Sequence, residues 1–129
     1  MADLGWMDSG TAYFEARLRR SDLGRESRLP GWTGRHVAAH VAANARALGR
    51  LVHWARTGEE RPMYDSPAAR DAEIDDLAAR LDAAELESLV KETAEELREV
   101  RGTAAELAAW VTGRGPAPSP GAPAIGRWL

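Results

Sequence analysis

The sequence predicts an all-α protein: an antiparallel bundle of three to five helices, followed by an extended C-terminal tail rich in Pro and Gly. Apolar residues recur at spacings of three and four over several stretches, which is the period of an amphipathic helix. Ala, Leu, Arg and Glu dominate the composition, and β-branched residues are few. The 129 residues suit a single domain. We therefore expect a helical domain over residues 1–112 and an irregular tail over 113–129.

The first predicted helix covers about residues 3–20. Its apolar positions fall on one face: Leu4, Met7, Thr11, Phe14 and Leu18. A break at 24–30 follows. The second predicted helix begins at Gly34 after the capping residue Thr33, and it ends near Thr57 because Gly58 is a favourable stop. We expect the larger aliphatic residues to form its inward stripe: Val37, Val41, Leu48 and Val52 or Ala55.

A third predicted helix begins at Ser66 and Pro67, because proline at the first helical position loses no hydrogen bond, and it reaches Leu81. Asp82 and Glu85 have the spacing of a capping box and predict the start of a fourth helix.

The fourth apolar repeat continues past Gly102. Residues 83–112 are therefore either one long helix or two helices with a break at that glycine, and we favour the break. Four prolines and several glycines then predict the tail over 113–129.

The composition excludes several kinds of function. The chain has no cysteine, which excludes disulfides, cysteine-ligated zinc and a cysteine nucleophile, so any reacting thiol must come from a cosubstrate. The net charge is −3, and acidic and basic residues are interspersed along the chain, which argues against a surface that binds nucleic acid. No apolar run approaches the roughly 20 residues of a membrane span. No basic region followed by an apolar one marks a secretory signal, so we expect a cytoplasmic protein without a membrane partner.

Two histidines are the strongest chemical signal in the residues themselves. His36 and His40 are four apart on one predicted helix, so their imidazoles point the same way and could share a metal ion. They are only two ligands, however. The alternative places one histidine in a hydrogen bond at the helix start and packs the other in the bundle. We expect His53, on a different face, to be partly exposed next to Trp54.

A distinctive run of residues lies within 29–74: Leu29 to Thr33, His36, His40, Asn44, His53 to Ala55, Thr57 to Glu60, Pro62 to Tyr64, Ser66 and Pro67. On these residues, this part of the chain resembles the metal-binding domain of the mycothiol-dependent maleylpyruvate isomerases. It implies a DinB-like helical metal-binding domain, which in the family precedes a smaller α/β domain. His40 matches the family's first metal-ligating histidine, whereas His36 matches a recurrent histidine that is not a ligand.

Residues 100–129 are similar to the C-terminus of the same family. Arg114 matches an arginine that is held to assist catalysis, and it could bind a substrate carboxylate. The alternative is a solvated arginine in a glycine-rich turn. Between the two matching stretches the chain looks internally shortened, because it lacks the Glu and the His four residues later that complete the family's metal site. Two of the three expected ligands are therefore absent.

Other residues could in principle replace the missing metal ligands, but the case for them is weak. Several carboxylates could reach a metal, although we expect them to be surface charge: Glu59, Glu60, Asp71, Glu73 and Asp75. A symmetric homodimer could instead pair the two copies of His40, and those of His36 as well, in a four-histidine site across the interface. We expect dimerisation itself, because an incomplete bundle would expose an apolar strip.

The resemblance implies a small-molecule substrate, zinc and mycothiol as cosubstrate. The implied reaction is the metal-assisted cis-to-trans isomerisation of maleylpyruvate to fumarylpyruvate through thiol addition. Because ligands are missing, we expect little isomerase activity. The alternative function is a non-catalytic remnant of the family that dimerises, or that binds a small molecule near His40, Trp54 and Tyr64.

Overall fold

In the computed structural model, residues 5–99 are described and form four α-helices. They are α1 (Gly5–Arg19), α2 (Gly34–Thr57), α3 (Pro67–Arg80) and α4 (Ala83–Glu99). Within this range the only β-type pairing is an isolated bridge between Glu26 and Thr33. The predicted all-α bundle is confirmed. The predicted break at Gly102 and the predicted tail over 113–129 lie outside the described residues.

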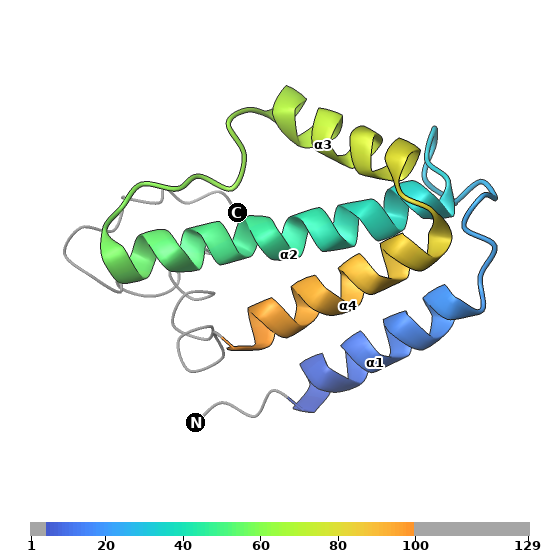
Figure 1. Ribbon diagram of the computed structural model, residues 1–129, viewed down its shortest axis with the longest axis horizontal. Coiled ribbons are helices and arrows are strands. Elements are labelled where there is room, and N and C mark those ends of the chain that lie inside the picture. The colour runs from blue at the N-terminus through green and yellow to red at the C-terminus, as the bar shows by residue number, and fades with distance from the viewer. Residues whose placement is uncertain (1–4, 100–129) are drawn as a thin grey trace.

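Helix α2 lies at the centre of the arrangement (Figure 1). It packs most extensively on α4 and also on α3, which lies on its other side, while α1 packs on the far side of α4. Helices α1 and α3 run opposite to α2 (Figure 1). Because α3 returns the chain, α4 runs in the same direction as α2, and the starts of α2 and α4 lie together.

The capping residues of α2 behave as the sequence predicts. Thr33 is extended and precedes the first helical residue. Gly58 follows the last one with a φ of 75°, a left-handed conformation that glycine adopts without strain. Its N–H donates to the Trp54 carbonyl at 2.8 Å. Both boundaries of the longest helix thus fall at the residues that the sequence predicts.

Local capping also sets the bounds of α3 and α4. The Ser66 hydroxyl accepts a hydrogen bond from the Ala69 N–H at 3.0 Å at the start of α3. At the start of α4, the Asp82 N–H donates to Glu85 Oε2 and the Glu85 N–H donates to Asp82 Oδ1, both at 2.8 Å. This is the reciprocal capping box that the spacing predicts. The third helix ends at Arg80, one residue before the predicted end.

The inward stripe of α2 differs from the prediction. Its most deeply buried residues are alanines, each at most 1% exposed: Ala38, Ala39, Ala42, Ala43 and Ala47. Val52 and Ala55 are buried as expected, but Val37, Val41 and Leu48 are only partly buried. Because α2 is packed on two sides, small side chains at the contacts let the neighbouring helices approach closely. The larger residues flank those contacts.

Helix α1 contributes less to the core than α2. Leu18 is its one buried residue, at 6% exposed. Trp6 and Tyr13 are 75% and 68% exposed.

No helix among residues 5–99 is both long and apolar enough to cross a bilayer.

Candidate functional site

His40 lies on α2, half-buried against the indole of Trp32, with the two ring centroids 5.5 Å apart. Its Nδ1 is buried and has no hydrogen-bond partner among the described residues. Burial, and secondarily the positive charge of Arg70, lower the pKa of His40 below its ordinary value. The imidazole is therefore neutral at neutral pH, and a neutral imidazole can bind a metal or accept a hydrogen bond.

His36 caps the start of α2. Its Nδ1 accepts a hydrogen bond from the Thr33 N–H at 3.2 Å and lies 3.0 Å from the Thr33 hydroxyl. Its Nε2 lies 3.5 Å from Oδ1 of Asp75 on α3. The alternative that placed one histidine in a hydrogen bond at the helix start is confirmed for His36. A nitrogen that accepts a backbone N–H has no lone pair left for a metal ion.

The donors around His40 that lie within residues 5–99 do not fit a zinc ion. Structural and catalytic zinc sites use three or four protein ligands. Among residues 5–99, no group of three or more His, Cys, Asp or Glu side chains is placed to share a metal ion. All three histidines lie in this range: His36 caps α2 and His53 contacts Glu59 at 2.9 Å. In addition, the positive charge of Arg70 would oppose a bound cation at His40.

The carboxylates that could have replaced the missing ligands lie elsewhere. Asp75 faces His36, Glu59 contacts His53 and Arg61, and Asp71 pairs with Arg70 at 2.8 Å. Glu60 is exposed. These four side chains are at the surface, as expected from the sequence, whereas Glu73 is partly buried and lines a hollow beside Tyr64.

A second polar feature surrounds Tyr64, in a hollow of about 380 Å³ between α2, the loop 58–66 and α3. The Tyr64 hydroxyl is buried and has no hydrogen-bond partner in the part of the chain that the structure describes. Burial, with the negative charge of Glu73, raises its pKa. The guanidinium of Arg50 lies 5.4 Å from the ring centre of Tyr64, and its Nε donates to the Met63 carbonyl at 2.8 Å. The sequence analysis named Tyr64 but missed Arg50, which no motif distinguishes from the many other arginines.

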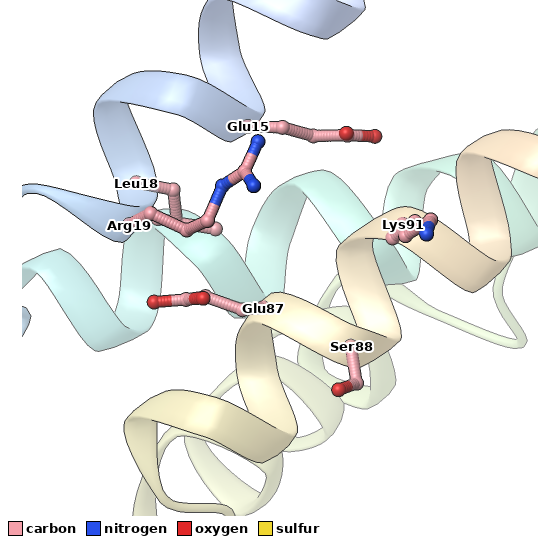
Figure 2. Close-up of a pocket in the computed structure, with 6 residues that line it drawn as sticks. All are labelled: Glu15, Leu18, Arg19, Glu87, Ser88 and Lys91. Atoms are coloured by element: carbon pink, nitrogen blue, oxygen red, sulfur yellow. The ribbon is translucent and has the colours of Figure 1, made fainter.

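Another hollow, of about 180 Å³, lies between α1 and α4 (Figure 2). Six residues line it: Glu15, Leu18, Arg19, Glu87, Ser88 and Lys91. Figure 2 shows side chains of both charges around it and none of the predicted site residues. We assign it no chemistry. Arg114, the predicted catalytic residue, lies outside the described residues.

The four helices define the chain as a helical-bundle domain whose candidate site residues His36 and His40 lie on its second helix. The sequence matches the family described as "Mycothiol maleylpyruvate isomerase N-terminal domain" over residues 8–129. The chain belongs to this family.

Two solved structures are similar to the chain. One is a mycothiol-dependent maleylpyruvate isomerase, with 40% identity, a TM-score of 0.73, and coverage of 84% of this chain and 45% of the enzyme. The other is a histidine-to-alanine mutant of a mycothiol-dependent maleylpyruvate isomerase, with 39% identity, a TM-score of 0.72 and the same coverage. The chain thus spans less than half the length of these enzymes. No curated protein matches it.

Proposed function

We propose that this chain keeps the helical scaffold and His40 of its family but does not, by itself, assemble the family's metal centre. By this proposal it isomerises maleylpyruvate slowly or not at all. Residues 1–112 would be the helical domain and 113–129 a tail that carries Arg114. The observation that supports this proposal is the engagement of His36 and His53 elsewhere, which leaves His40 as a lone imidazole beside a positive charge.

The chemistry explains why a lone imidazole is insufficient. In the isomerisation, a thiolate adds to the activated double bond, the resulting single bond rotates, and the carbon–sulfur bond breaks to restore the double bond. The reaction is redox-neutral and consumes no thiol. With no cysteine in the chain, the thiol would be mycothiol. A thiol is mostly protonated at neutral pH unless a cation or a base lowers its pKa. Arg70 and neutral His40 would give only partial help, and Arg114 would hold a substrate carboxylate.

Metal content is the first test. We expect protein purified without chelator to contain well under one zinc per chain by mass spectrometry, with no difference between wild type and His40→Ala. His53→Ala is the matched control, because this histidine is exposed and paired with Glu59. Stoichiometric zinc that is lost only in His40→Ala would overturn the proposal.

Turnover is the second test. An ultraviolet assay of maleylpyruvate with added mycothiol should give a rate close to that without protein. Rapid turnover that falls in Arg114→Ala and His40→Ala would contradict the proposal and would instead establish the chain as an isomerase.

The Tyr64 hollow supports a second candidate function, the binding of a small molecule without turnover. A buried, unpartnered hydroxyl costs free energy unless something bonds to it. Tyr64→Phe removes only that hydroxyl, so it should weaken the binding of a small polar ligand, measured by calorimetry, without lowering stability.

Homodimerisation through an uncovered strip also remains a proposal, which analytical ultracentrifugation of the full chain would test.

A further inference from the structure

Three aromatic rings lie side by side at the start of α2. The indole of Trp32, just before the helix, is stacked on the His36 ring, with centroids 6.2 Å apart and planes 19° apart. The other contact of the same indole is with His40, at 5.5 Å and 49°. The same indole therefore contacts both imidazoles and covers part of His40.

The hydrogen bonds of His36 determine its tautomer. The Thr33 N–H can only donate, so the Nδ1 that faces it at 3.2 Å must carry a lone pair. In the neutral ring, the hydrogen is then on Nε2, which faces Oδ1 of Asp75 at 3.5 Å. A carboxylate is an acceptor, so both nitrogens have a partner of the right kind only in this tautomer. The ring is thus held by α3 as well as by the turn before α2.

We propose that His36 is a positioning residue: held in the Nε2–H form between Thr33 and Asp75, it keeps Trp32 against His40. Its role is to fix the polar group of the site without touching a ligand. This inference rests on the proposed function in one respect only, that His40 is the polar group of the site. The usual residue at this third helical position of a capping box is Glu or Gln, which can cap but cannot stack as an aromatic ring.

Nuclear magnetic resonance of the full ¹⁵N-labelled chain, with chelator present, tests the proposal. The long-range ¹H–¹⁵N spectrum of the histidines should show His36 in the Nε2–H form. Nuclear Overhauser effects should connect the Trp32 indole with the His40 ring. In His36→Ala these contacts should be lost, because both the cap and the stack are removed. In His36→Gln these contacts should also be weakened: the amide oxygen can still accept the Thr33 N–H, but the side chain has no ring to stack on the indole.

Two control variants distinguish a specific effect of His36 on Trp32 and His40 from a general loss of stability. His53→Gln changes an exposed histidine at the other end of α2, and Asp76→Asn changes the carboxylate next to Asp75, which pairs with Arg80 instead. Both should leave the Trp32–His40 signals unchanged.

Three results would overturn the inference: an Nδ1–H form of His36, persistence of the Trp32–His40 contacts in His36→Ala, or their persistence in His36→Gln. The tautomer is measured on the unaltered protein, so the proposal remains testable if His36→Ala does not fold. Because none of these signals requires zinc or thiol, their failure is distinguishable from a failure of the proposed function.

Discussion

The two ends of α2 are held in different ways. At its start, the Gly34 and Arg35 N–H groups donate to the carbonyls of Arg25 and Leu23, at 3.0 and 2.9 Å. The Arg35 side chain donates to a carbonyl in the last turn of α3 and to that of Leu81, which follows the helix, and His36 faces α3. The start of the helix is therefore tied to three other parts of the chain.

The last turn of α2 has mainly local partners. His53 contacts Glu59, six residues later, and Glu59 also pairs with Arg61 at 3.3 Å. These side chains are largely exposed, so solvent screens their interaction. His40 therefore lies near the start of α2, where segments distant in the sequence fix the backbone. A side chain can be held precisely at such a position.

The largest expected effect is that of Arg35→Ala. The Arg35 Nε donates to the Ala78 carbonyl at 2.7 Å, and its Nη2 donates to the Leu81 carbonyl. Loss of these charged hydrogen bonds should lower the free energy of unfolding by about 2–3 kcal/mol. Arg56→Ala, which changes an exposed arginine at the other end, should change it by less than about 0.5 kcal/mol. Urea denaturation measures both, and equal effects would contradict the comparison.

Two glycines of α2 should respond with opposite signs. A Cβ at Gly34 would lie 2.9 Å from the Leu23 Cα, so backbone must move, and Gly34→Ala should destabilise the fold by about 1–3 kcal/mol. At Gly49 a Cβ would meet nothing within 4 Å, so Gly49→Ala should stabilise the helix by about 0.5–1 kcal/mol. The denaturation midpoints should move in opposite directions. Stabilisation by Gly34→Ala would show that the start of α2 is not tightly packed.

The pH dependence of stability tests the environment of His40. Its pKa is lowered in the folded state, by burial first and by Arg70 second, so the unfolded chain binds the proton more readily. The contribution of His40 is therefore complete above its unfolded pKa of about 6.5 and is lost as the pH falls through that value toward the lower folded pKa. The melting temperature of wild type should fall more steeply between pH 7 and 5 than that of His40→Gln. Parallel curves would show that His40 is solvated.

The smallest expected effect is at the end of α2. The hydrogen bond from His53, followed by that from Arg61, lowers the pKa of Glu59. His53→Ala should raise this pKa toward its ordinary value, as measured by a ¹³C titration of the carboxylate. Because Glu59 is fully exposed, the melting temperature should not change measurably. A clear loss of stability would mean that this end is held as firmly as the start.

The sequence predicted the described helices well because their ends depend on neighbouring residues. The residues that mark the helix ends interact with residues three or four positions away, so their effect can be predicted from the sequence: Thr33, Gly58, Ser66 and Asp82. The stripe of α2 was predicted wrongly at Val37, Val41 and Leu48, because hydrophobicity ranks these residues above alanine, whereas close helix packing selects the smaller side chain.

The site was predictable only in part. The choice between capping and metal binding for His36 depends on Asp75, which is 39 positions away in sequence and comes close only through the packing of α3 on α2. The contact of Trp32 with both imidazoles depends in the same way on the course of the loop before α2. The assignments of His40 as a ligand and of Arg114 as catalytic remain predictions.

The alanines at the centre of α2 have a consequence for how this scaffold can be altered. A methyl group has no rotamers, so the surface that meets the neighbouring helices is set by the backbone and cannot adjust by side-chain rearrangement. Any redesign that enlarges one of these positions must shift a whole helix along or away from α2. Room for a new ligand is therefore more easily created in the loops than between the helices.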